Sequence, residues 1–466
     1  MKRSFARPSC GPRTAGALAA TLLLGGCAAD GAGPSVAGGP VSGASVSGVL
    51  VSQSASSREP ALSTASYSER VDTTQPTFSD PTTITNPLFP VSTLTQVIQV
   101  GAEAGERLRH EITLLPRTRT IEWMGQDVET LVRQFAAYRD GQILEVAYDY
   151  FAEADDGSVW YFGEDVDNYE DGVIADHEGS WLAGRDGPPG MIMPAKPERG
   201  DVYRPENIPG LVFEEVTVQS VDERVEGPTA PVDKAILVEE MLMDGTREAK
   251  ILAPGYGEFR AEVVTEEELV TVSVATPIDT IRGQVPNDLG QISGSALDIL
   301  ATDDTKDWAH IGASRAALTT AWDSYRHSDV SLPSVEQMQA ALDALGPAVA
   351  DEDHDDTRAA AADVANAAFD LELRHRSAAL VDVSRLHLQS RQLLGDAAAH
   401  KTEFVLGDIA TLQTIWDRSA YAVDGKVRAK VNALLADLHA AVDVGDFVSA
   451  PVIGGQLHAL FSDLRG

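Results

Sequence analysis

Apolar residues recur at every second position from about residue 76 to residue 282. Between residues 144 and 150 the apolar positions are Leu144, Val146, Tyr148 and Tyr150. A period of two places successive side chains on opposite faces of a β-strand, so strands with one apolar face are predicted. Asp-Gly pairs that begin at residues 140, 156, 171 and 244 separate these runs and favour tight hairpins. We therefore expect an antiparallel sheet, either curved like a half-barrel or packed as a sandwich.

The pattern changes to a helical one in the last third of the chain. Apolar residues, mostly Ala and Leu, recur three and four positions apart in seven segments, near residues 304–326, 334–345, 355–376, 383–399, 402–420, 425–442 and 448–464. Short breaks such as Leu332-Pro333 and Gly346-Pro347 favour antiparallel neighbours, as in an all-α bundle. The sequence thus predicts an α+β protein with two domains, a β-sheet followed by a helical bundle.

Changes in composition predict where the domains begin and end. After a leader at residues 1–26, residues 27–75 are rich in Ser, Gly and Ala and are typical of a flexible tether. Pro277, Pro286 and several glycines interrupt the pattern after the last strand. We predict a β domain at 76–282, a linker at 283–298 and the bundle at 299–466.

The first 26 residues have the pattern of an export leader. Residues 2–13 carry four basic and no acidic side chains, and Ala15–Leu24 is a short apolar run. About ten residues cover roughly 15 Å as a helix, about half of a bilayer core, so the run is typical of a leader and not of a membrane-spanning helix.

The next residues, Leu24-Gly25-Gly26-Cys27, resemble the lipobox of bacterial lipoproteins. The resemblance implies cleavage before Cys27, attachment of diacylglycerol to its thiol, and a membrane-anchored protein of the cell envelope, outside the cytoplasm. An ordinary secretory leader followed by a chance cysteine is the alternative.

The net charge limits the classes of binding partner, and the cysteine content indicates how the fold is stabilised. The formal net charge is −35, which repels phosphate backbones, so nucleic acid is excluded as a partner. Cations, small apolar ligands and other envelope proteins remain as partners. Of the two cysteines Cys10 lies in the leader, so no disulfide within the mature chain is expected and buried cores must supply the stability.

A series of motifs lies between Tyr148 and Tyr203. It comprises Trp160–Val166, Glu178–Trp181, Pro189–Ala195 and Gly200–Arg204, with Ile84–Pro90 upstream and Ala253–Gly257 downstream. This series resembles a family of uncharacterised exported bacterial proteins, which implies kinship but no catalytic residue. The meander of long strands is also similar to half-barrel lipoprotein carriers of the LolA type, a likeness that implies a carrier fold.

Four large apolar residues of these motifs are candidates for ligand binding: Trp160, Phe162, Met191 and Met193. Met and aromatic side chains suit adaptable apolar pockets, so the four residues either line a groove for an apolar or lipid-like ligand or fill the interior of the sheet. The sequence leaves both interpretations open.

One calcium-loop pattern lies in the same region. Asp167, Asp171, Gly172 and Glu178 match the first, fifth, sixth and twelfth positions of an EF-hand loop, but Tyr169 occupies the third, where a side-chain oxygen is required. Strands are expected on both sides instead of helices. A divalent-metal site at Asp167, Asp171 and Glu178 is therefore weighed against a solvated acidic hairpin turn.

A second metal hypothesis concerns the helical region. Glu372 and His375 have the Glu-x-x-His spacing that places both side chains on one helical face, as in carboxylate metal bundles. Asp307 and His310 form the nearest approximation to the second pair that such bundles need. Surface histidines are the alternative interpretation.

No pattern in the sequence indicates nucleophilic catalysis. There is no Gly-x-Ser-x-Gly elbow and no His-Glu-x-x-His helix, and Ser180 and Asp186 are merely available polar groups. We therefore predict a non-catalytic, lipid-anchored binding or envelope-associated protein. The alternatives are a metal-binding protein and an unrecognised hydrolase.

Overall fold

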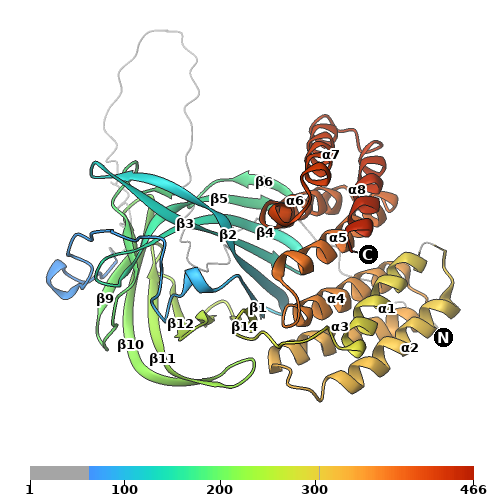
Figure 1. Ribbon diagram of the computed structural model, residues 1–466, viewed down its shortest axis with the longest axis horizontal. Coiled ribbons are helices and arrows are strands. Elements are labelled where there is room, and N and C mark those ends of the chain that lie inside the picture. The colour runs from blue at the N-terminus through green and yellow to red at the C-terminus, as the bar shows by residue number, and fades with distance from the viewer. Residues whose placement is uncertain (1–61, 304, 466) are drawn as a thin grey trace, which may run out of the picture.

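The computed structural model describes residues 62–303 and 305–465, which form a large antiparallel sheet followed by a bundle of eight helices (Figure 1). The prediction of an α+β chain in two parts is thus confirmed. The strands are β1 (Gln96–Glu103), β2 (Glu106–Trp123), β3 (Gln126–Arg139), β4 (Gln142–Glu153), β5 (Val159–Glu170), β6 (Val173–Asp176), β7 (Trp181–Leu182), β8 (Gly190–Met193), β9 (Val202–Ile208), β10 (Val212–Glu226), β11 (Pro231–Leu242), β12 (Arg247–Ala253), β13 (Gly257–Val263) and β14 (Glu268–Thr276).

The strands form one continuous open sheet instead of a two-sheet sandwich. Their order is β6-β5-β4-β3-β2-β1-β14-β13-β12-β11-β10-β9, with β7 and β8 both paired to β5. Most neighbours are joined by hairpins, and the pair β1–β14 connects the first half of the sheet to the second. The backbones of β8 and β9 also lie very close together. A Cβ atom added to Gly190 of β8 would lie only 1.8 Å from the carbonyl oxygen of Pro205 in β9. Only glycine fits there, and β8 partly fills the opening between β5 and β9.

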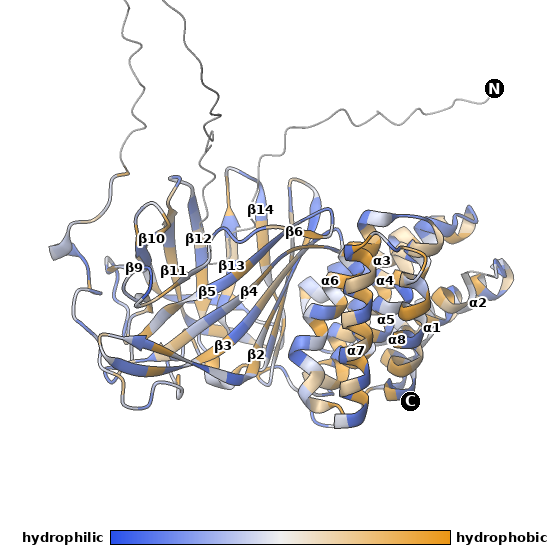
Figure 2. Ribbon diagram, turned by 90° about the horizontal axis from the view of Figure 1, so that it is seen from above, coloured by the Kyte–Doolittle hydropathy of each residue, from blue (hydrophilic) through white to orange (hydrophobic). Residues whose placement is uncertain are grey.

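The strands of this sheet have a packed inner face. Apolar and polar residues alternate along them (Figure 2), as the period-two pattern predicts. The main hydrophobic core lies on the inner face and includes Phe135, Phe151 and Val216. Side chains from the segment before β1, among them Phe78 and Phe89, belong to the same core. The interior of the curved sheet is therefore filled by the chain itself.

The helices cover part of the outer face. They are α1 (Asn287–Asp303), α2 (Trp308–Tyr325), α3 (Leu332–Ala350), α4 (His354–Glu372), α5 (Ala378–Ala398), α6 (Thr402–Ser419), α7 (Gly425–Asp443) and α8 (Ala450–Arg465). Ile98 of β1 and Val274 of β14 share a buried cluster with Leu289 and Phe369 of the helices. Ala136 of β3 packs likewise with Ala410 of α6. These two contacts join the bundle to the sheet.

Side chains at the helix N-termini explain where several helices begin. Asp307, Ser331, Asp353 and Asp424 each precede a helix and accept a hydrogen bond from a backbone N–H of its first turn. Such caps satisfy N–H groups that have no partner inside the helix and contribute about 1 kcal/mol each.

Two predicted boundaries were wrong. The tether was predicted to reach residue 75, but Ala65 already donates its N–H to Glu215 at 2.8 Å, and Arg70 forms a β-bridge with Val202. The linker was predicted at 283–298, but α1 begins at Asn287. Its Leu289, Ile292 and Ile299 are fully buried in the bundle, so packing stabilises a helix in spite of its glycines.

The predicted leader and lipidation site, including Cys27, lie outside the described residues. Within residues 62–303 and 305–465 no helix combines the length and the apolar character needed to cross a membrane.

Candidate functional site

The four predicted ligand-binding residues lie in the packed core. Trp160, Phe162, Met191 and Met193 are each at most 6% exposed and belong to the main hydrophobic cluster. The rings of Phe162 and Phe78 meet edge-on with their centroids 5.3 Å apart. The indole N–H of Trp160 donates to the hydroxyl of Ser158 at 2.8 Å. Their surroundings are those of the interior-packing interpretation, and these side chains do not present a groove.

The structure does not bring the predicted metal ligands of the helices together. Glu372, at the end of α4, is buried and accepts hydrogen bonds from Ser293 and Arg376, both at 2.8 Å. Asp307 caps α2, and His310 contacts Asp298 at 2.7 Å. In the described part of the chain, one group of potential metal ligands converges, and it contains none of Glu372, His375, Asp307 and His310. The two-pair bundle site has no support in this geometry.

The predicted calcium loop is a hairpin turn between β5 and β6. Asp171 and Gly172 both have positive φ, as two-residue turns between strands require. Asp167 contacts His177 at 2.9 Å, and the backbone carbonyl of Glu178 accepts from Asn168. Strands β5 and β6, and not helices, flank this turn, so it lacks the surroundings of an EF-hand.

The two polar residues considered for hydrolysis have structural contacts of their own. The Ser180 hydroxyl accepts the N–H of Val166 at 2.8 Å. Asp186 accepts the N–H of Leu182 at 2.8 Å and pairs with Arg185 at 2.7 Å. No contact in the described chain joins Ser180 to Asp186, so these residues do not form a nucleophile–acid pair here.

A large opening lies between the outer face of the sheet and the bundle. It is a cavity of about 640 Å³, and we call it the sheet–bundle cavity. Its floor is formed by residues of β1, β2, β3, β4 and β14, and α3, α4, α5 and α6 form its walls. A volume of 300–1,000 Å³ is typical of sites for small organic molecules, which lie preferentially between domains.

The basic side chains that line the cavity are already paired with acidic ones. Arg107 contacts Asp363, and Lys401 contacts Asp355 at 2.9 Å. Arg358 likewise pairs with Asp396. Each of these cations therefore has an anionic partner, whereas Glu267 and Glu336 of the lining have no ion pair with a described residue, so the lining offers no unpaired cation for an anionic ligand.

The uncharged part of the lining is better suited to binding. The side chains of Gln142, Asn366 and Gln392 are half-buried, and their amide groups make no hydrogen bond to another described residue. Leu269 and Phe404 line the same cavity and remain 39% and 41% exposed, so they offer apolar surface to a ligand. Free amides and exposed apolar groups thus occur side by side in one cavity.

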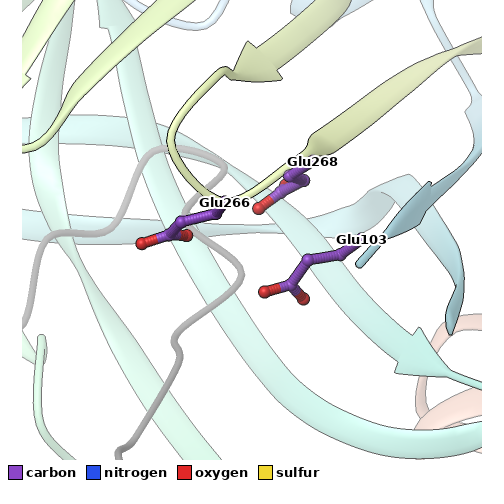
Figure 3. Close-up of side chains that lie close together, drawn as sticks. All are labelled: Glu103, Glu266 and Glu268. Atoms are coloured by element: carbon purple, nitrogen blue, oxygen red, sulfur yellow. The ribbon is translucent and has the colours of Figure 1, made fainter. Parts of the chain in front are cut away.

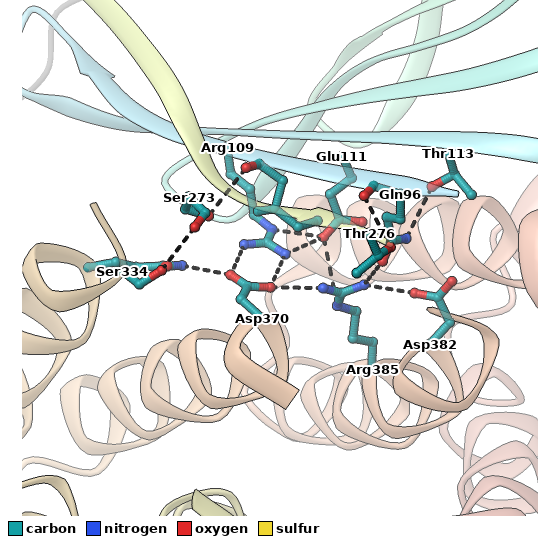
Figure 4. A network of polar contacts seen from close by, with 12 residues as sticks. Gln96, Arg109, Glu111, Thr113, Ser273, Thr276, Ser334, Asp370, Asp382 and Arg385 are labelled. Carbon is teal, nitrogen blue, oxygen red and sulfur yellow. Dashed lines mark hydrogen bonds and ion pairs between the residues drawn. The ribbon is translucent and has the colours of Figure 1, made fainter. Parts of the chain in front are cut away.

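A buried ion-pair network, which we call the interdomain network, forms one end of the cavity (Figure 4). Arg109 of β2 binds both carboxylate oxygens of Asp370 on α4, at 2.6 and 2.7 Å. Arg385 of α5 contacts Asp370 at 2.8 Å and Asp382 at 2.9 Å. Arg418 of α6 then joins Asp382, at 2.9 Å, to Glu111 of β2, at 2.5 Å. Three cations and three anions therefore connect strand β2 to three helices.

The electrostatics of the interdomain network favour its charged form. Burial alone raises the pKa of the Glu111 carboxyl, but the charges of Arg418, Arg109 and Arg385 outweigh it and hold the pKa well below its usual range. The pKa of Asp370 is lowered for the same reason, by Arg109 and Arg385 against its burial. All three acids and all three arginines are almost fully buried, except for Arg109, which is 16% exposed.

The inner face of the sheet carries a second polar group, the inner carboxylates. They are Glu145, Asp149, Glu164, Glu206, Glu214, Glu240 and Glu248, each at most 4% exposed. Lys250 pairs with Glu240 and, at 3.1 Å, with Glu248. Burial, together with neighbouring carboxylates, raises the pKa values of Glu164, Glu206 and Glu214 well above the usual range. These carboxyls therefore favour the protonated form more strongly than exposed glutamates do.

Sequence reasoning missed both polar groups. Arg109 and Glu111 alternate with apolar residues, as in any half-exposed strand, and nothing local indicates that helices cover them. The inner carboxylates did leave a signal, because Glu145 and Asp149 lie between apolar residues in a strand that is buried on both faces. Comparisons with protein-family models, curated proteins and solved structures found no match for this chain.

Proposed function

We propose that this protein is a lipid-anchored binding protein of the cell envelope, and that its ligand is a small, uncharged amphipathic molecule held in the sheet–bundle cavity. The anchor is the predicted acylation of Cys27. The observation that supports the ligand site is the cavity of about 640 Å³ whose floor and walls come from different domains. Sites between domains are typical of binding proteins.

The lining supports this class of ligand. Since the cations of the cavity are paired with acidic side chains, an anionic ligand would have to break ion pairs in order to bind. A neutral molecule with hydroxyl or amide groups has partners in Gln142, Asn366 and Gln392. The apolar part of such a molecule would contact Leu269 and Phe404. Burial of their exposed surface would stabilise the complex by about 25 cal/mol per Å².

A short-chain alkyl glucoside is a suitable probe, because it combines uncharged hydroxyls with an apolar tail. Full-length protein in nanodiscs would be titrated with the probe below its micelle concentration and binding followed by calorimetry. We expect saturable binding that Asn366→Ala or Gln392→Ala weakens by about tenfold, since each loses one hydrogen-bonding group. Gln291→Ala, on the exposed surface of α1, is the matched control and should bind as wild type. Equal binding by all four proteins would contradict the proposal.

A further inference from the structure

Three glutamates converge at one end of the β1–β14 strand pair. Glu103 ends β1, Glu268 begins β14, and Glu266 lies in the turn between β13 and β14 (Figure 3). One carboxylate oxygen from each lies within 4.8 Å of the other two, which is a spacing that a single cation can bridge. In the described chain this is the one convergent group of three potential metal ligands.

Glu268 has no partner in this arrangement. It is 3% exposed, and its carboxylate makes no hydrogen bond or ion pair with any described residue. Figure 3 shows its side chain directed toward Glu103 and Glu266. Buried carboxylates are normally paired or coordinate a metal, because an isolated buried charge is costly. The unpartnered Glu268 therefore points to a missing positive ligand.

We propose that Glu103, Glu266 and Glu268 form a binding site for one calcium ion. An all-oxygen set of carboxylates suits a hard divalent cation, and calcium accepts 6–8 oxygen ligands in flexible geometry, whereas magnesium requires a near-ideal octahedron. Three protein carboxylates leave room for water in a calcium shell. Glu266 is only half-buried, so a cation has a path to the site from solvent.

Nearby charges leave the site attractive to a cation. Arg139 pairs with Glu103 through one carboxylate oxygen and lies 3.5 Å from Glu106, so it neutralises part of the negative charge. The second oxygen of Glu103 remains available. The carboxylates of Glu266 and Glu268 have no ion pair with a described residue, so a cation would be the shared partner of all three side chains.

The site is separate from the sheet–bundle cavity. Glu103 and Glu268 follow the inner face of β1 and β14, the face that carries Val97 and Val270, whereas Ala102 and Leu269 line the cavity on the outer face. Calcium binding is therefore testable without any cavity ligand, and either proposal can fail alone.

The test is calorimetric titration of calcium chloride into the full-length, chelator-treated protein in nanodiscs of neutral lipid. We expect one calcium per chain with a dissociation constant of about 10⁻⁴–10⁻³ M, the range of extracellular modules. Glu268→Gln keeps the side-chain shape but removes one charged ligand, and should weaken binding by about tenfold or more. Glu262→Gln, on the outer face of β13 where it pairs with Arg260, is the matched control and should bind as wild type.

Glu266→Gln provides a second variant, because its half-buried side chain lies in a turn and its substitution leaves the core untouched. It should also weaken calcium binding by about tenfold. Circular dichroism without calcium would verify that each variant is folded. Absence of saturable binding to the wild type at about 10 mM calcium, or wild-type affinity in both Glu268→Gln and Glu266→Gln, would overturn the proposal.

Discussion

Arg109 of β2 and Asp370 of α4 form a two-point ion pair, with Nη1–Oδ2 and Nη2–Oδ1 distances of 2.6 and 2.7 Å. They lie 261 residues apart in the chain and belong to different domains. A paired guanidinium and carboxylate at this position fixes how the sheet meets the bundle, and so fixes one end of the cavity between them.

Asp370→Asn should destabilise the protein by about 3–5 kcal/mol, because the substitution leaves the buried charges of Arg109 and Arg385 without their shared partner. Urea unfolding followed by circular dichroism measures the change. Asp233→Asn breaks the exposed ion pair with Arg224 and is the control, with an expected change of less than about 1 kcal/mol. Similar losses in the two variants would show that the interdomain network does not hold the domains together.

The part of the fold that the sequence predicted depends on local patterns. The period-two runs and Asp-Gly turns predicted the antiparallel strands, and three- and four-residue spacings predicted seven of the eight helices that the structure describes. α1 was missed because Gly290 and Gly294 interrupt its apolar pattern. Its stability comes from packing against α2 and α4, which no local pattern reveals.

The candidate sites depend on contacts between distant residues, so the sequence did not predict them. Glu103 and Glu268 meet only because β1 pairs with β14, the last of the strands in the sequence. The sheet–bundle cavity requires the orientation of four helices relative to five strands. The pairs that do have local spacing, such as Glu372 with His375, were predicted as sites, but Glu372 instead stabilises the end of α4 through Arg376.

Stability should depend on pH through the inner carboxylates, and Glu145 isolates one contribution. Burial, with a smaller effect from Asp149, raises the pKa of Glu145 to about 8. Because the pKa of Glu145 is higher in the folded state than in the unfolded state, its protonation contributes to the free energy of unfolding. This contribution is complete below the unfolded-state pKa, near 4.5, and is lost as pH rises toward 8. Glu145→Gln, which stays neutral, should therefore gain stability relative to wild type by up to about 1.4 kcal/mol per pH unit between about pH 5 and 8.

Urea unfolding of wild type and Glu145→Gln at several pH values would measure this difference. Glu170→Gln, in the same sheet but exposed, is the control and should show a difference that does not change with pH. A pH-independent difference for Glu145→Gln as well would mean that Glu145 is charged throughout.

The predicted anchor is tested by Cys27→Ala. The wild-type protein should enter the detergent-rich phase of a phase-separation assay, because two or more acyl chains give stable membrane anchoring. Cys27→Ala should remain in the aqueous phase, and intact-mass measurement should show that it lacks the lipid. Equal partitioning of both proteins, or an unmodified mass for the wild type, would contradict acylation.

The most direct test of the binding role is titration of the Ala340→Trp variant with the alkyl glucoside. Ala340 of α3 lines the sheet–bundle cavity and is exposed, so an indole there would occupy the space without disturbing the core. The control is Ala313→Trp, on the exposed surface of α2 and outside the cavity lining. We predict saturable binding by the wild type and by Ala313→Trp and none by Ala340→Trp. Undiminished binding by Ala340→Trp would show that the ligand does not lie between the sheet and the bundle.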